Sequence, residues 1–166
     1  MDPRIRRLEL RDVDAVLSIQ SACREIAQWT NQDYVCIASG QDAARNAGPD
    51  ASSIGLVAER APDVMGFLMA RQIAGDLEIL NLAVHPGIRR EGVGTALLLE
   101  AVNWANSFDA ENAFLEVRES NLPALRFYEL HNFRVTGRRR GYYASPPEDA
   151  LLLTAPVCRS STPSSL

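Results

Sequence analysis

Two closely spaced glycines precede a segment with the apolar periodicity of a helix. They are the residues with the clearest chemical potential in the chain. Residues 89–95 read Arg-Arg-Glu-Gly-Val-Gly-Thr and follow an apolar strand pattern. A Gly-x-Gly at the start of a helix leaves backbone N–H groups unobstructed, and the helix dipole adds partial positive charge there. The motif therefore favours a bound phosphate or pyrophosphate, although the same spacing is also typical of a simple tight turn.

Two other phosphate-binding motifs are excluded by the neighbouring residues. A dinucleotide-binding fingerprint requires a third glycine three residues after the second, and position 97 is Leu. A P-loop requires Gly-Lys followed by Ser or Thr, and all 17 basic residues of this chain are Arg. The absence of Lys also excludes catalysis through a Schiff-base lysine.

The elements that must position this motif follow from apolar periodicity and from helix-capping residues. Strand patterns occupy residues 77–84 and 112–117, with a helix predicted over 95–106 between them. Asn121 is suited to cap a helix over residues 122–130, with Pro123 in its first turn. The other predicted elements are a strand at 4–10, a helix opened by Asp12, a helix near Tyr34 after a capping box at 30–33, a surface loop at 39–53, a hairpin of strands at 54–59 and 64–70, and final strands at 133–135 and 150–154. This order predicts an α/β fold with a mixed sheet.

Length and charge limit the class of protein. A chain of 166 residues is typical of one domain, which we expect to span residues 1–156, before a disordered polar tail at 157–166. The net charge of -4 argues against nucleic-acid binding, because phosphate neutralisation dominates such binding. The run at residues 138–140, Arg-Arg-Arg, is a local exception that we interpret as a solvated strand end.

Cysteine usage and hydropathy point to a compartment. Cys23, Cys36 and Cys158 are few and lack metal-ligand spacing, which indicates a reduced, cytoplasmic protein without a metal. The chain has no apolar segment of roughly 18 residues, so we expect no membrane span. We expect a monomer or a homodimer.

Spaced motifs in the second half of the chain resemble those of one enzyme family. The Arg-x-x-Gly-x-Gly of residues 89–94 resembles the acyl-CoA motif of the GNAT N-acetyltransferases. Residues 114–133 read Phe-Leu-Glu-Val-Arg-Glu-Ser-Asn-x-x-Ala-x-x-x-Tyr-x-x-x-x-Phe, and with residues 138–143 and 148–150 they resemble the ribosomal-protein-alanine N-acetyltransferases. The resemblance implies the GNAT fold, a mixed twisted sheet of about six to seven strands flanked by about four helices.

The resemblance implies acetyl-CoA as the cosubstrate and no metal. The backbone of residues 82–84 would pair with the pantetheine arm, and N–H groups of residues 90–95 would hold the pyrophosphate. Arg89 and Arg90 would lie near the anionic end, and Asn121 near the thioester. The residues assigned to the cofactor in this way are Leu82, Ala83, Val84, Arg89, Arg90, Glu91, Gly92, Val93, Gly94, Thr95 and Asn121.

The resemblance also implies two catalytic residues. Glu116 would accept a proton from the attacking amine, directly or through water, and Tyr128 would protonate the leaving CoA thiolate. An α-amino group is about 10% neutral at pH 7 and a Lys side chain about 0.04%, so an N-terminal amine demands less of the base. From the pattern alone, Glu116 also fits the outward face of a strand, and Tyr128 also fits a core aromatic.

The sequence says less about the acceptor site than about the cofactor site. Trp29, Tyr34, Tyr142 and Tyr143 are candidates to line the acceptor pocket, and each also fits a packing role. The segment at residues 27–30 and the loop at 39–53 depart from the ribosomal-protein-alanine pattern, which affects the acceptor rather than the cofactor. The hypotheses are transfer to a protein N-terminus, such as the N-terminal alanine of a small-subunit ribosomal protein, transfer to a small-molecule amine or lysine side chain, and a non-catalytic acyl-CoA sensor.

Overall fold

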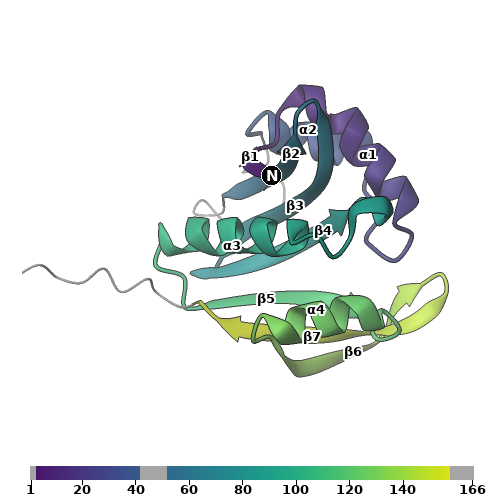
Figure 1. Cartoon of the computed structure of the whole chain (residues 1–166). Helices are drawn as coiled ribbons and strands as arrows, with labels where there is room; N and C mark the ends of the chain where they lie inside the picture. Colours follow the sequence, from purple (N-terminus) through teal and green to yellow (C-terminus); the bar gives the residue numbers. More distant parts are fainter. Residues whose placement is uncertain (1–2, 42–51, 158–166) are drawn as a thin grey trace, which may run out of the picture.

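One mixed sheet with helices on both faces organises the protein (Figure 1). The structure is a computed structural model that describes residues 3–41 and 52–157. Its strands are β1 (Arg4–Arg7), β2 (Ser53–Arg60), β3 (Asp63–Ile73), β4 (Asp76–Val84), β5 (Asn112–Arg118), β6 (Arg134–Ala144) and β7 (Pro147–Pro156). They form a seven-stranded sheet in the order β1-β2-β3-β4-β5-β7-β6, antiparallel except for β4 and β5. This confirms the predicted α/β fold with a mixed sheet.

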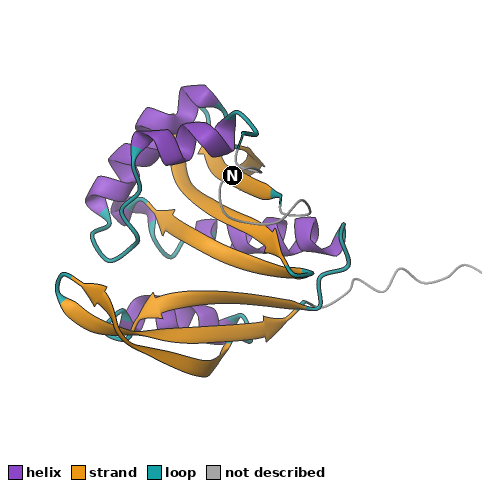
Figure 2. Ribbon diagram, turned by 180° about the vertical axis from the view of Figure 1, so that it is seen from behind, coloured by secondary structure: helices purple, strands orange, loops and turns teal. Residues whose placement is uncertain are grey.

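The helices divide between the two faces of the sheet (Figure 2). They are α1 (Val13–Ala22), α2 (Asn31–Ala38), α3 (Val93–Asn106) and α4 (Leu122–Leu130), with short 3-10 turns η1 (Leu10–Asp12) and η3 (Pro86–Ile88). Val16 of α1 and Tyr34 of α2 share one core cluster with Phe67 of β3. Leu97 of α3 and Tyr128 of α4 belong to the other cluster. No described helix is both long and apolar enough to cross a membrane.

A bulge in β4 separates it from β5. Met69 pairs with Asn81 and Ala70 with Ile79, so Leu80 is an extra residue on β4, and such a residue bends its strand. The parallel pairing of β4 with β5 covers only residues 77–79 and 113–115. Figure 1 shows the two strands moving apart beyond these pairs. We call residues 80–84 of β4 and 116–118 of β5 the strand fork. Among the residues that the structure describes, no strand pairs with its β4 arm on the β5 side.

The predicted helix caps are present where the chain enters α2 and α4. The Thr30 hydroxyl accepts a hydrogen bond from the Asp33 N–H at 3.3 Å, and the Asp33 carboxylate accepts one from the Thr30 N–H at 2.7 Å. Asp12, expected to open α1, stands at its N-cap position but makes no side-chain cap. Its carboxylate instead accepts hydrogen bonds from Arg6 and from the Glu9 N–H.

Several element boundaries differ from the prediction. The first strand ends at residue 7, and α3 begins two residues early, at Val93. The strand predicted at 133–135 is the start of β6, so residues 138–140 lie within an edge strand rather than at its end. Val157, assigned to the tail, is buried, and its N–H donates to the Glu111 carbonyl. Cys158, the rest of the tail and most of the loop predicted at 39–53 lie outside the described residues.

Candidate active site

The start of α3 has the open geometry that an anion site at these glycines would need. Gly92 occupies the N-cap position with φ of +81°, and no side chain caps the helix. The N–H groups of the first turn have no carbonyl one turn earlier in the helix. A Cβ placed on Gly92 would meet no atom within 4 Å, so the approach is open. These features fit the pyrophosphate of an acyl-CoA, held by backbone N–H groups of residues 92–95.

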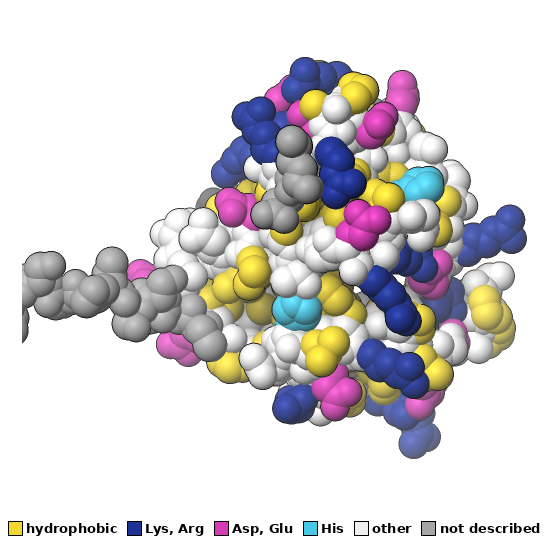
Figure 3. Space-filling view, viewed as in Figure 1, with side chains coloured by type: hydrophobic (Ala, Val, Ile, Leu, Met, Phe, Trp, Pro, Cys, Tyr) yellow, Lys and Arg dark blue, Asp and Glu magenta, His cyan; other side chains and the backbone are white. Residues whose placement is uncertain are grey.

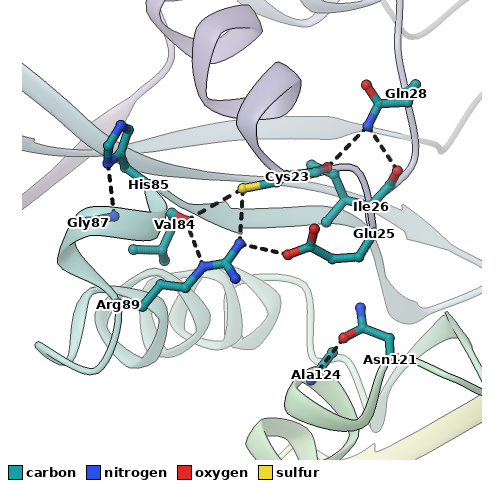
Figure 4. Close-up of polar contacts among 10 residues, drawn as sticks. All are labelled: Cys23, Glu25, Ile26, Gln28, Val84, His85, Gly87, Arg89, Asn121 and Ala124. Atoms are coloured by element: carbon teal, nitrogen blue, oxygen red, sulfur yellow. Dashed lines mark hydrogen bonds and ion pairs between the residues drawn. The ribbon is translucent and has the colours of Figure 1, made fainter.

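The turn that leads from β4 to this site is held by a histidine. The His85 ring nitrogen Nδ1 accepts a hydrogen bond from the Gly87 N–H at 3.2 Å (Figure 4). Pro86 stands in the first turn of η3, directly after His85. The side chain of His85 therefore stabilises the turn after β4.

The Arg89 side chain points toward the segment after α1, where Cys23 and Glu25 lie (Figure 4). Its Nη2 lies 2.6 Å from Glu25 Oε1 and 3.1 Å from Cys23 Sγ, and its Nε donates to the Val84 carbonyl at 3.2 Å. Burial raises the pKa of the Cys23 thiol, which favours the neutral form. Arg89 thus ties the end of β4 to the segment after α1, and its expected place near the anionic end of the cofactor remains a prediction.

Asn121 caps α4 and keeps one polar group available. Its Oδ1 accepts a hydrogen bond from the Ala124 N–H at 3.2 Å, as the sequence predicts. Figure 4 shows the amide nitrogen pointing away from α4. That nitrogen has no hydrogen-bond partner among the described residues. It is a donor suited to a carbonyl of the cofactor, which is the role that the sequence resemblance implies.

The Tyr128 side chain extends from α4 into the core. Its side chain is 6% exposed, and its ring packs against Phe127 and Phe133 with centroids 5.1 and 5.3 Å apart. Its hydroxyl makes no hydrogen bond to any part of the chain that the structure describes. Burial raises the pKa of Tyr128 well above its ordinary value, because the phenolate would lose its hydration. The hydroxyl therefore keeps its proton at neutral pH and is suited to donate it.

Glu116 stands on the β5 arm of the strand fork. Leu115 and Val117 on either side of it enter the core, so Glu116 faces the opposite side of the sheet. Its side chain is 19% exposed, and its Oε1 lies 2.7 Å from the Arg139 Nε of β6. The carboxylate is thus half-buried, paired with Arg139 and directed to the face where α1 and α2 pack.

A bulge in β6 allows the side chains of Arg139 and Tyr142 to reach Glu116. The register between β6 and β7 shifts between Arg139 and Tyr143, and Gly141 within the shift has φ of +59°. The Gly141 N–H donates to Asp149 Oδ1 at 2.9 Å, which holds the bulge. Burial and a hydrogen bond to Glu116 raise the pKa of Tyr142, so its phenol remains protonated.

The two tyrosines of β6 form a small aromatic group beside Glu116. Tyr142 and Tyr143 meet edge to face at 5.1 Å, and the Arg118 guanidinium lies 4.0 Å from the Tyr143 ring centroid. Glu148 fixes Arg118 at 3.1 Å. The structure thus gathers both of these predicted acceptor-site residues around the predicted base.

The other two predicted acceptor-site residues lie elsewhere. Tyr34 is fully buried, and its hydroxyl donates to Gln20 Oε1 at 2.5 Å. Trp29 is half-buried against the Tyr34 ring, with centroids 5.4 Å apart. As placed here, Tyr34 is a core residue. Trp29 keeps part of its side chain accessible.

Sequence reasoning missed three residues of this region. Arg139 belongs to a charge run that we interpret as solvated, and the bulge that turns it toward Glu116 has one weak sign, Gly141 after three arginines. Glu25 and Cys23 contact Arg89 across a separation of more than 60 residues. No local pattern reveals such a contact.

Comparisons with known proteins point to one enzyme family. The sequence profile of the Acetyltransferase (GNAT) family matches residues 15–133. A Bacillus subtilis protein provisionally named ribosomal protein bS18-alanine N-acetyltransferase is 30% identical over 90% of this chain and 92% of its own length. An N-alpha-acetyltransferase of Sulfurisphaera tokodaii is 32% identical over 93% of each chain.

A solved structure shows the same fold. The ribosomal-protein-S18-alanine N-acetyltransferase of Escherichia coli superposes with a TM-score of 0.77, covers 99% of each chain and is 23% identical. The family profile spans α3, the strand fork and α4, which carry the candidate anion site, Glu116 and Tyr128. The chain belongs to the GNAT acetyltransferase family and is an acyl-CoA-dependent N-acetyltransferase.

Proposed function

We propose that this enzyme transfers the acetyl group of acetyl-CoA to the α-amino group of a protein N-terminus, in the cytoplasm. The observation that carries the proposal is the place of Glu116: a half-buried carboxylate on the strand fork, beside two tyrosines. The names of the two relatives support this acceptor class, since one refers to an alanine of a ribosomal protein and the other to N-alpha-acetylation. For this chain we propose the N-terminal alanine of a small-subunit ribosomal protein.

In this mechanism Glu116 and Tyr128 move protons on opposite sides of the reacting bond. When bound, acetyl-CoA supplies the thioester carbonyl, to which the amine forms a C–N bond as the C–S bond breaks. Glu116 accepts the proton that the amine loses, directly or through water. Tyr128 gives its proton to the departing thiolate. An acceptor that binds as an ammonium ion loses two protons in all, one before it attacks and one as the amide forms. One of them restores the proton of Tyr128, and the other is released to solvent.

The residues around the fork would hold the two substrates. Backbone groups of residues 82–84 would bind the pantetheine arm, because the β4 arm lacks a strand partner there. The N–H groups at the start of α3 and the Asn121 amide would bind the pyrophosphate and the region of the thioester. Tyr142 and Tyr143, beside Glu116, would wall the acceptor.

A matched set of peptides tests this function. One peptide begins with a free alanine and contains an internal Lys, and its control is the same peptide with a blocked N-terminus. Spermidine and free lysine are further acceptors. We expect CoA release only with the free N-terminus, and tandem mass spectrometry should locate the acetyl group there. Release with the blocked peptide or with spermidine alone would assign another acceptor, and acetyl-CoA binding without turnover would indicate a sensor.

Replacing Tyr128 by Phe tests the acid. The ring still fills the core, while the proton donor is lost. We expect kcat to fall by about 100-fold, with the dissociation constant of acetyl-CoA unchanged. Phe127→Leu is a control that alters the neighbouring packing and leaves the hydroxyl in place. A Tyr128→Phe enzyme with full kcat would remove Tyr128 from the mechanism.

A further inference from the structure

In this structure an oxygen of the proposed base is occupied by a cation of the protein itself. Glu116 Oε1 lies 2.7 Å from Arg139 Nε. An acceptor amine at neutral pH is mostly an ammonium ion. It must therefore approach a carboxylate that already has a positive partner.

The cation comes from the bulge in β6. In a regular strand, residues three positions apart face opposite sides of the sheet. The irregular register between Arg139 and Tyr143 allows Arg139 and Tyr142 both to reach Glu116. The Arg139 Cζ also lies 5.5 Å from the centroid of the Tyr142 ring. The bulge thus builds a three-residue group from β6 and β5, two strands that β7 separates in the sheet.

The two partners of this ion pair differ in exposure. The Arg139 side chain is 62% exposed, whereas Glu116 is 19% exposed. Two neighbouring arginines have carboxylates of their own: Arg118 pairs with Glu148 and Arg71 with Glu78. An ion pair with one solvent-exposed partner is weak, because water solvates the released cation. Arg139 can leave Glu116 at small cost, while Glu116 stays in place on β5.

We propose that Arg139 is a positioning residue that stands in for the acceptor. In the free enzyme its guanidinium occupies Glu116, and the α-ammonium of the acceptor replaces it on binding. The exchange conserves charge at the half-buried carboxylate, and Tyr142 remains as its second partner. An acceptor that arrives without a positive charge displaces Arg139 poorly, so the pair selects for cationic amines. This inference rests on the proposed function of Glu116 as the base.

Steady-state kinetics of Arg139→Met test the exchange. Methionine keeps much of the side-chain length and removes the competing charge. We expect KM for the alanine peptide to fall roughly two- to fivefold, with kcat and the KM for acetyl-CoA unchanged. Arg139→Lys should restore the wild-type KM, because an ammonium group can also occupy Glu116. Arg134→Met is the matched control: it lies on the same strand, is 67% exposed and lies 4.0 Å from Glu129.

Each outcome separates the inference from the function on which it rests. A KM for Arg139→Met equal to that of Arg134→Met would overturn the inference and leave the proposed function standing. A loss of kcat in Arg139→Met without a lower KM would also overturn it, because Arg139 would then act during the reaction. Failure of the wild-type enzyme to acetylate any peptide N-terminus would overturn the function and the inference together.

Discussion

Two arginine–carboxylate groups on this molecule have similar chemistry and opposite surroundings. Arg6 makes two hydrogen bonds to Asp12, of 2.7 and 2.9 Å, and also contacts Glu59, and all three side chains are at most 16% exposed. Arg139 holds Glu116 by one contact and is 62% exposed. The first group joins β1, η1 and β2 with no partner that can leave. In the second group Arg139 is exposed to solvent, so a ligand can displace it from Glu116.

The hollow beside the first group supports this distinction. Arg6, Asp12 and Glu59 line a cavity of about 540 Å³ between α1 and the turn from β2 to β3. Arg6 pairs with both carboxylates, so each of these three charged groups has a partner among the other two. Figure 3 shows acidic and basic side chains interspersed over one face of the molecule, without a large region of one sign. Pairing and exposure, more than the size of a hollow, identify where chemistry is possible.

The largest effect on this comparison should come from Arg6→Met. Asp12 would keep a buried charge without its partner, and breaking such a pair costs about 3 kcal/mol. Urea unfolding should show this loss of unfolding free energy, and the KM values of any folded enzyme should stay unchanged. Arg11→Met is the control, since its pair with Glu9 is exposed. Equal losses in the two variants would mean that the enclosed group is no more important than a surface pair.

Acid should weaken the enclosed group by a smaller amount. Burial opposes the charge of Asp12, but hydrogen bonds from Arg6 and the Glu9 N–H outweigh it and hold the pKa of Asp12 below its ordinary value. A pKa lowered on folding gives stability that is present above the unfolded pKa, near 4, and is lost as pH falls through the folded pKa. Unfolding free energy should therefore fall more steeply below about pH 4 in the wild type than in Arg6→Met. Parallel curves would show that Arg6 does not set the pKa of Asp12.

The smallest effect on stability should come from Arg139→Met. An exposed ion pair contributes roughly 0.5 kcal/mol or less, so the unfolding curves of Arg139→Met and Arg134→Met should nearly coincide. A loss comparable to that of Arg6→Met would show that the Arg139–Glu116 pair holds the fold. It would then not be free to exchange with an acceptor.

Features that depend on residues close together in the chain could be predicted from the sequence, and features that depend on long-range packing could not. The caps at Thr30 and Asn121 act over three residues, so their patterns predict both caps and the start of α4 correctly. The helix expected near Tyr34 begins earlier, at Asn31, directly after its cap. The extent of β6 could not be predicted, because an exposed edge strand needs only backbone pairing and shows no apolar alternation. The strand fork depends on the bulge at Leu80, inside an apolar run that reads as one continuous strand.

The site, like the fold, could be predicted only where its residues are close together in the chain. The open start of α3 follows from Gly92 and its neighbours, which are contiguous in the chain. Tyr34 and Tyr142 look alike in sequence, yet one is enclosed by α1 and β3 and the other stands exposed on β6. Long-range packing decides between these outcomes. The contact of Arg139 with Glu116 depends in addition on a bulge that no apolar pattern reveals.

The most direct test of the account is the pH dependence of kcat for Glu116→Gln at saturating alanine peptide. Glutamine preserves the size of the side chain but cannot take a proton. We expect kcat at pH 7 to fall by about 100-fold. It should then rise with pH up to about 8, as the bound amine loses its proton unaided. A Glu116→Gln profile that superposes on the wild-type profile would contradict the assignment of Glu116 as the base.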